Sequence, residues 1–412
     1  MNNRPKAIIL GGSHAHIALI ENLKRRGYYT VLVDYYEEPP AKRFADEHIR
    51  ESTLDQTKIL DIAQGLDAKL VISTCLDQPI PIACYVSERL GLPTPYKYET
   101  TLNVTNKGLM KKKMVENQIP TSKYIIVDDV TDVEIDGMKF PVIVKPIDST
   151  GSLGVRKAND LFELNKYLKD AIRISRTNKA IVEEYSKGIE VSFDCFIQNK
   201  IVHLIMMRRQ FKMRDDGELG MQSIGSITPI EISQTAKQNI QQVANKIADA
   251  FDLDNTPLLI QAFINDDNIN IIEFAARLGG GTHIKNVKLN TGFDILNSAV
   301  DSYLGIHTNI RYKQSESYCA TNIIYSLPGV FGSIMGCENL IDRGIVEEFF
   351  IYKTKGMEIP KGLSSRNRVG AFLVKANTKE ELFKKIAMAR NEIEVLDADG
   401  NSIMRKDIYL RE

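Results

Sequence analysis

The chain has 412 residues, which is enough for about two to four compact domains. Hydrophobic residues make up 43% of it and charged residues 26%, as in ordinary globular proteins. Lys and Arg together number 53, as do Asp and Glu, so the formal net charge is zero. This balance argues against nucleic acid as a partner, and any anionic ligand has to be held by local positive groups.

Cysteine usage and hydropathy indicate a reducing, aqueous environment. The cysteines show no paired spacing of the kind seen in disulfide frameworks or zinc sites, and most lie in apolar stretches. The apolar run at residues 7–10 is too short for a signal peptide, and no run approaches the roughly 18 apolar residues of a membrane span. We therefore expect a cytoplasmic protein with no membrane partner.

Residues 5–93 alternate short apolar strands with helices. Strands are expected at residues 7–10, 30–33 and 70–73, and helices at 15–26, 59–64 and 82–90. Such alternation predicts a parallel, doubly wound sheet, which binds ligands beyond the carboxyl ends of its strands.

The turn Gly11-Gly12-Ser13 follows the first of these strands. A dinucleotide site requires the pattern G-x-G-x-x-G and an acidic residue further on. Asp34 supplies the acid, but His14-Ala15-His16 stands where further glycines are needed. A plain turn or a small-anion site at the helix N-terminus is favoured instead.

The rest of the chain mixes strands and helices. Helices are expected at residues 105–120, 160–174, 234–251, 292–304 and 379–391. Strands are expected at 140–144, 180–184, 191–197 and 201–207, with a hairpin formed by 258–265 and 270–274. Residues 208–228 are polar and contain glycine, so we expect a mobile loop there.

Lys145 ends a buried strand and precedes a Gly/Ser-rich turn at residues 149–154. One fixed cation beside several backbone N–H groups suits a polyphosphate. The segment is not a Walker A loop, because the lysine precedes the glycines. On its own, an ordinary strand–loop–helix connection explains it equally well.

Two acidic segments follow in the chain. Glu183 and Glu184 end a strand, and Glu190 lies beyond Gly188; such a hinge can offer backbone groups to an adenine edge and a carboxylate to a ribose. Solvated acids at a strand end explain this pattern better if it stands alone. In the second segment, Glu273 precedes Arg277 and three glycines. A carboxylate suits Mg²⁺, and arginine neutralises phosphoryl charge.

In their order along the chain, these segments resemble the ATP-grasp superfamily, specifically its carboxylate–amine ligase branch, with L-amino-acid ligases, biotin carboxylase and the carbamoyl phosphate synthetase large subunit. The resemblance begins at residues 7–12, passes through Asn106-Lys107 and ends near residues 370–374. It implies an α/β and α+β ATP-grasp fold. The implied parts are a doubly wound pre-ATP-grasp domain (1–104), a small lid subdomain (105–190), a central subdomain (191–313) and a C-terminal α+β portion (314–412).

The resemblance also implies an ATP site. Lys107 and Lys145 would contact the phosphates, Lys145 with a catalytic role. Glu183 would hold adenine together with the backbone of Glu184, Tyr185 and Ser186, and Glu190 would hold the ribose. The turn that would close over the phosphates consists of Ser149, Gly151, Ser152 and Gly154.

For the metal, the resemblance assigns Glu273 to Mg²⁺, with Mn²⁺ as an alternative. The family usually has an acid where this chain has Gln261 and often an Asn where it has Ala275. Gln261 can still offer an oxygen, whereas Ala275 cannot. Arg277 would be catalytic, by stabilising the transferring phosphoryl group. The residues implied to receive the substrate are Gly279, Gly280, Gly281 and His283, and a helix N-terminal polar residue is the plainer interpretation of His283.

The implied function is an ATP-dependent ligase that joins a small-molecule carboxylate to an amine through an acyl phosphate. One alternative is a bicarbonate-activating, carbamoyl-phosphate or purine-type ligase. Another is a non-catalytic ATP-binding regulator, given Gln261 and Ala275. A homodimer is expected from the resemblance alone. Further candidates are a lid that clamps phosphate or substrate, for which a solvated loop is an equally good interpretation, and an acceptor site past the strand at residues 70–73. The lid residues are Arg208, Arg209, Lys212 and Arg214, and the acceptor residues are Asp77 and Gln78.

Overall fold

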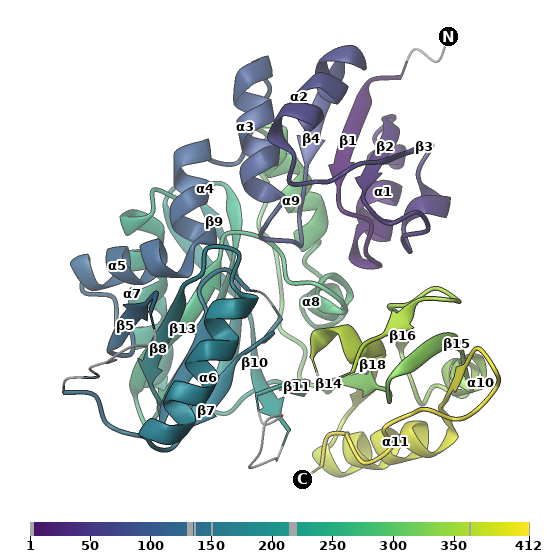
Figure 1. Ribbon diagram of the computed structural model, residues 1–412. Helices are drawn as coiled ribbons and strands as arrows, with labels where there is room; N and C mark the ends of the chain where they lie inside the picture. The colour runs from purple at the N-terminus through teal and green to yellow at the C-terminus, as the bar shows by residue number, and fades with distance from the viewer. Residues whose placement is uncertain are drawn as a thin grey trace.

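The computed structural model describes residues 4–129, 135, 137–149, 151–213, 221–361 and 364–411. Their strands form a parallel N-terminal sheet, a small antiparallel sheet, a large antiparallel sheet and a short C-terminal sheet (Figure 1). This mixture confirms the expected fold class. Among the described residues, we find no helix with both the length and the apolar character that crossing a bilayer requires.

The N-terminal sheet is parallel and has the strand order β3-β2-β1-β4. Its strands are β1 (Lys6–Leu10), β2 (Tyr29–Asp34), β3 (Glu47–Arg50) and β4 (Ala68–Ile72), and its helices are α1 (Ala15–Arg25), α2 (Gln56–Gly65) and α3 (Ile80–Leu90). The apolar runs of β1, β2 and β4 are fully buried, as expected for strands covered on both faces. β3 was not expected, because its sequence offers only one apolar residue.

The small sheet has the order β5-β8-β6-β7 and is covered by α6 (Leu161–Ile174), as Figure 1 shows. Its strands are β5 (Tyr124–Val127), β6 (Val142–Pro146), β7 (Arg156–Ala158) and β8 (Ala180–Glu184). Leu164, Leu168 and Ala171 recur at helical spacing on α6 and are buried against this sheet. Asp160 accepts a hydrogen bond from Glu163 N and caps the helix.

The large sheet has the order β13-β12-β9-β10-β11-β14-β18-β16. Its first five strands are β9 (Ile189–Gln198), β10 (Ile201–Lys212), β11 (Ser223–Thr228), β12 (Thr256–Asn265) and β13 (Asn268–Ala275). The remaining three, β14 (Tyr318–Tyr325), β16 (Glu348–Ile351) and β18 (Arg368–Ala376), come from the C-terminal part. The C-terminal residues therefore extend the central sheet and do not form a separate body.

Helices connect these layers. Helix α7 (Gln234–Ala250) packs on the large sheet, and α8 (His283–Thr291) and α9 (Ile295–Tyr303) pack between it and the N-terminal layer. Phe196 of β9, Val287 of α8 and Leu296 of α9 belong to the same buried cluster as the N-terminal strands. The remaining elements are β15 (Gly329–Met335), β17 (Glu358–Ile359), β19 (Glu394–Asp397), α10 (Cys337–Asp342) and α11 (Lys379–Glu392).

Three expectations about local structure were wrong. The segment 208–228 is mostly strand, because β10 pairs with β11 through Arg209↔Ile227; residues 214–220 lie outside the described residues. The single helix expected at 105–120 is two helices, α4 (Tyr98–Thr105) and α5 (Lys107–Glu116), since the Asn106 side chain accepts from Leu109 N and starts a new helix. Helix α8 was missed. The expected domain boundaries stay a prediction.

His16 on α1 predicts a pH-dependent stability. Its side chain is completely buried, with Nδ1 2.9 Å from Ser13 Oγ and Nε2 without a partner among the described residues. Burial lowers its pKa from 6.5 to about 4, against a smaller opposing effect of Ser13. Between these values the unfolded chain binds a proton that the folded chain does not, so the free energy of unfolding should fall by about 2 kcal/mol from pH 7 to pH 5.

Chemical denaturation of the wild type and of His16→Gln at both pH values checks this. The variant should lose most of that pH dependence, while His307→Gln, at an exposed position, should keep it. An identical pH dependence in all three proteins would show that His16 does not contribute.

Candidate functional site

One cavity of about 1070 Å³ lies where the sheets meet. Lys145 from β6, Glu190 from β9 and Glu273 from β13 all line it. Ser13 and His14 reach it from the carboxyl end of β1, the end at which a parallel sheet binds ligands. Segments far apart in the sequence therefore meet in one site.

Strand alternation explains why so many polar side chains reach this cavity. On β9, Glu190 and Ser192 face it; on β10, Arg208, Gln210 and Lys212 do. These residues are two apart, so each set lies on one face of its strand. The residues between them, such as Val191 and Phe193, are fully buried on the other face of the sheet.

Glu183, at the end of β8, is held by two lysines. Its carboxylate is paired with Lys145 Nζ on one oxygen, and its other oxygen lies 3.1 Å from Lys111 Nζ. Lys111 comes from α5, is 2% exposed and also donates to Thr121 Oγ1 at 2.5 Å. Burial alone would raise the pKa of Glu183, but Lys145 and Lys111 lower it to about 2. This carboxylate is thus ionised and its oxygens are engaged by cations.

Lys107 and Glu273 form a second charged pair, 3.4 Å apart. Lys107 Nζ also donates to the carbonyl of Ser149 at 2.8 Å, which ties α5 to the glycine-rich turn. Lys107 lowers the pKa of Glu273, against burial.

Gln261 lies directly across from Glu273 in the pairing of β12 with β13, and both line the cavity. Ala275 is two residues further along β13 and lines it too. Among the residues that the structure describes, no three His, Cys, Asp or Glu side chains form a ready metal cluster. The oxygens that suit Mg²⁺ here are therefore one carboxylate and one neighbouring amide.

Arg277 is fixed by Asp77, which follows β4 in the N-terminal domain. Arg277 Nε and Nη2 donate to the two Asp77 oxygens at 2.5 and 2.6 Å, and Nη1 donates to the carbonyl of Leu278 at 2.6 Å. Burial opposes the charge on both partners, yet their pairing raises the pKa of Arg277 and lowers that of Asp77. Leu278 N also donates to Thr74 O at 3.0 Å, so this corner of the cavity joins two layers.

At the edge nearest β10, Lys212 Nζ lies 2.9 Å from Glu190 Oε1. Lys212 therefore belongs to strand β10, which places it at the cavity without a lid loop. Arg209, the neighbour of Arg208, is exposed on the opposite side of the strand. Of the four residues expected in a lid, Arg208 and Lys212 line the cavity, Arg209 does not, and Arg214 lies outside the described residues.

The glycines differ in their roles. Gly151 and Gly281 have φ near +63°, a backbone conformation that favours glycine, and added Cβ atoms would meet Ser365 and the Tyr352 hydroxyl at 2.5 and 2.6 Å. Gly154 was expected in the ATP site but is not among the residues lining the cavity. It packs against Pro146 and Ile174.

Nearly all the other expected site residues line this cavity. They are Lys107, Lys145, Ser149, Gly151, Ser152, Glu183, Glu184, Tyr185, Ser186, Glu190, Gln261, Glu273, Arg277, Gly279, Gly280, Gly281 and His283, with Asp77 and Gln78.

Sequence reasoning missed several residues at the site. Lys111 was read only as part of a basic helix, and nothing local marks it as buried. Asp194 could have been noticed, because it continues the two-residue spacing of Glu190 and Ser192 on an apolar strand. Lys353 and Arg368, which line the cavity from the C-terminal part, carry no such signal.

Glu183→Gln tests the buried charge cluster. Removing the carboxylate leaves Lys145 and Lys111 close together without their shared partner, so the free energy of unfolding should fall by about 3 kcal/mol. Denaturant titration measures this. Glu184→Gln is the matched control, because Glu184 is half-buried and accepts from Lys139 N, which a glutamine oxygen can also do. Equal losses in both variants would contradict the prediction.

Comparisons with known proteins point to an ATP-grasp domain. The model of the ATP-grasp domain family matches residues 138–286. A phosphoribosylamine–glycine ligase of Thermococcus kodakarensis is 26% identical over 297 residues, which are 66% of this chain and 67% of that protein. For other archaeal ligases of that name, the chain spans only about half of their length.

Among solved structures, an L-amino acid ligase from Bacillus licheniformis has a TM-score of 0.79 with 18% identity, covering 96% of this chain and 99% of that one. Phosphoribosylglycinamide synthetase from Anaerococcus prevotii has a TM-score of 0.74 with 18% identity, covering 95% and 99%. At this level of identity the structural likeness concerns the fold. The family match shows an ATP-grasp domain at residues 138–286, and the chain is similar to ATP-grasp carboxylate–amine ligases.

Proposed function

We propose that this protein uses Mg-ATP to convert a small-molecule carboxylate into an acyl phosphate, which an amine then attacks to give an amide, ADP and phosphate. One observation carries the proposal. Lys145, Glu190 and Glu273 come from three separate segments and line a single cavity together with Arg277. Such a set supplies cations for phosphates and carboxylates for a ribose and a metal ion.

Within this proposal, Lys107 and Lys145 bind the phosphates of ATP. Both now neutralise carboxylates, Glu273 and Glu183, so an incoming triphosphate finds cations that are already held in place. Glu190 takes the ribose hydroxyls, and the backbone of Glu184 to Ser186 meets the adenine edge. Positioning and electrostatics supply most of the catalysis in such phosphoryl transfers.

Glu273 and Gln261 would hold Mg²⁺, since their side chains are cross-strand neighbours on adjacent strands and offer hard oxygens. The ion, when bound, neutralises phosphate charge. Arg277 orients the transferring group, while the turn at Gly279–Gly281 admits the carboxylate, because backbone without side chains allows a close approach. A carboxylate oxygen attacks the γ-phosphorus and the bond to the ADP oxygen breaks. The amine nitrogen then attacks the acyl carbon, and phosphate leaves.

Phosphate release in the presence of Mg-ATP, measured over a panel of amino acids and other small carboxylates with amines, tests the proposal. We expect release that depends on one substrate pair, with an amide of matching mass. Glu273→Ala should lower kcat by about a hundredfold. Glu231→Ala, at an exposed position, should not. ATP binding without turnover over the whole panel would instead indicate a nucleotide-binding regulator.

A second candidate is a purine-type ligase, and specific observations favour it. The archaeal relatives carry the name phosphoribosylamine–glycine ligase. In addition, Lys353 and Arg368 line the cavity, and neither has a carboxylate partner among the described residues. Two such cations suit a phosphorylated substrate. Glycine with freshly generated 5-phosphoribosylamine in the same assay separates this case from ligation of two unphosphorylated amino acids.

The amide at position 261 predicts weak metal binding. Gln261→Glu restores the acid that the family usually has there, so the Mg²⁺ concentration at half-maximal phosphate release should fall by about tenfold. Gln238→Glu, exposed on α7, is the control for a general effect of added negative charge. An unchanged Mg²⁺ dependence would mean that position 261 does not face the metal.

A further inference from the structure

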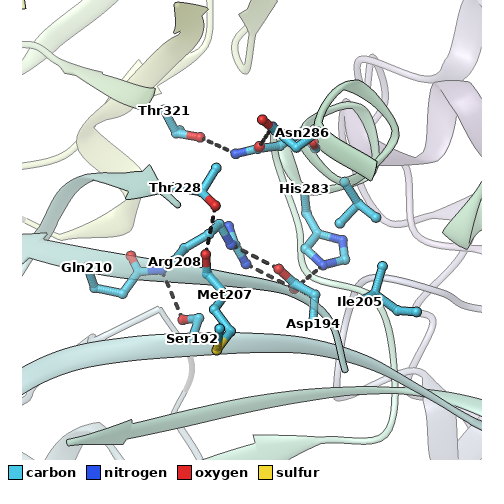
Figure 2. A network of polar contacts seen from close by, with 12 residues as sticks. Ser192, Asp194, Ile205, Met207, Arg208, Gln210, Thr228, His283, Asn286 and Thr321 are labelled. Atoms are coloured by element: carbon cyan, nitrogen blue, oxygen red, sulfur yellow. Dashed lines mark hydrogen bonds and ion pairs between the residues drawn. The ribbon is translucent and has the colours of Figure 1, made fainter. Parts of the chain in front are cut away.

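Besides the pair of Asp77 with Arg277, a second aspartate–arginine pair lies at the cavity wall, which its arginine, Arg208, lines. Asp194 on β9 is 0% exposed in its side chain, and Arg208 on β10 lies against it. Arg208 Nη2 donates to Asp194 Oδ1 at 3.0 Å, and Arg208 Nε lies 3.0 Å from Oδ2 (Figure 2). Burial opposes ionisation of Asp194, but Arg208 and then His283 lower its pKa. The aspartate is therefore a fixed anion that orients the guanidinium.

His283 connects this pair to the glycine turn. It is the first residue of α8, directly after Gly279–Thr282, and its Nε2 lies 2.5 Å from the same Asp194 oxygen that Arg208 contacts. A carboxylate can only accept, so Nε2 carries the hydrogen. Figure 2 shows the Asp194 carboxylate between Arg208 and His283, and His283 directly follows the turn that is proposed to receive the substrate.

Residues before and after Arg208 on β10 are held in place by hydrogen bonds to the neighbouring strands. Thr228 on β11 donates to the carbonyl of Met207 at 2.8 Å, and Gln210 donates to Ser192 Oγ at 2.9 Å (Figure 2). Arg208 itself is 8% exposed, and it lines the cavity. A braced, nearly buried cation of this kind costs little further entropy when a ligand binds.

Arg277 and Arg208 differ in which of their guanidinium nitrogens remain available to a ligand. All three nitrogens of Arg277 donate to Asp77 or to the backbone of Leu278. Arg208 donates to Asp194 through Nη2 only; its Nε lies 3.0 Å from Oδ2 but is buried without a hydrogen bond, whereas its Nη1 has no partner among the described residues and is not sealed from the cavity. Of these two arginines, only Arg208 keeps a terminal nitrogen with both hydrogens free, whereas Nη1 and Nη2 of Arg277 each have at most one hydrogen left for the transferring group.

We propose that Arg208 binds the carboxylate group of the acyl substrate, with Asp194 and His283 as its positioning residues. This rests on the proposed function. Arg208 Nη1 donates to the carboxylate oxygen that does not attack ATP. The same oxygen becomes the carbonyl oxygen of the acyl phosphate and gains negative charge when the amine attacks, so the contact persists through both steps. The substrate class is then an anionic carboxylate small enough to enter beside the glycine turn.

Direct binding of phosphonoacetate, a stable compound that combines a carboxylate with a phosphonate, tests this. Isothermal titration is done on protein saturated with Mg-ADP. Arg208→Met should weaken phosphonoacetate binding by about ten- to a hundredfold, the loss of one charge-assisted hydrogen bond in a desolvated site. ADP affinity, measured separately, should stay within about twofold, because Arg208 is not assigned to the nucleotide.

Two further variants make the result specific. Arg209→Met is the matched control, since Arg209 is the exposed neighbour on the other side of β10 and stacks on Phe211; it should bind the probe as the wild type does. Asp194→Asn keeps Arg208 but removes its charged partner. It should lower the affinity for phosphonoacetate less than Arg208→Met does. If the thermal transition shows that one of these variants is unfolded, Arg208→Lys is used in its place. Arg208→Lys should bind phosphonoacetate only partially, because an ammonium lacks the second nitrogen of the guanidinium.

The inference is overturned if wild-type protein with Mg-ADP binds no phosphonoacetate, or if Arg208→Met and Arg209→Met bind it equally well. Either result leaves the proposed ligase activity standing wherever phosphate release is observed. Conversely, a protein that binds Mg-ADP and requires Arg208 for phosphonoacetate, yet releases no phosphate on the panel, supports the inference about Arg208 while the proposed activity fails.

Discussion

Pairing of buried charges is the interaction on which the cavity depends. Isolated ions are costly in a partly desolvated space, and here four carboxylates around the cavity each have a cation within reach. Glu183 has Lys145 and Lys111, Glu273 has Lys107, Asp77 has Arg277, and Asp194 has Arg208. The pairing keeps the cations charged and in place at the cavity wall. A bound anion then meets groups that need little reorganisation.

Sheet geometry decides which charges meet. Because side chains alternate along a strand, the chain can bury Val191 and Phe193 on one face while Glu190 and Ser192 face the cavity. Neighbouring strands repeat the pattern in register, so Gln261 lies across from Glu273. The N-terminal layer is joined to this sheet by the pair of Asp77 with Arg277 and by the buried helices α8 and α9. The N-terminal layer, α8, α9 and part of the large sheet thus share one core, and they bound part of the cavity.

The fold class followed from the sequence because its signals are local. Short apolar runs between helices indicated the parallel N-terminal sheet, and Lys145 before a glycine turn marked a strand end facing a cavity. The wrong expectations about secondary structure also have local causes. Polar residues on β10, among them Arg208 and Lys212, face the cavity and give that strand the composition of a loop. Asn106 interrupts a basic segment that otherwise reads as one helix, because its side chain caps the next one.

Partners distant in sequence could not be predicted in the same way. The sequence near Lys111 does not indicate that its ammonium group reaches Glu183, 72 positions further on. That contact depends on how α5 lies against β8. The same holds for Asp77 with Arg277 and for Asp194 with His283. Sequence patterns therefore identified which residue types the site contains, whereas the packing of layers decided which nitrogen atoms remain available to a ligand. On that criterion Arg208 stands apart from Arg277, although the motif containing Arg277 was far easier to recognise.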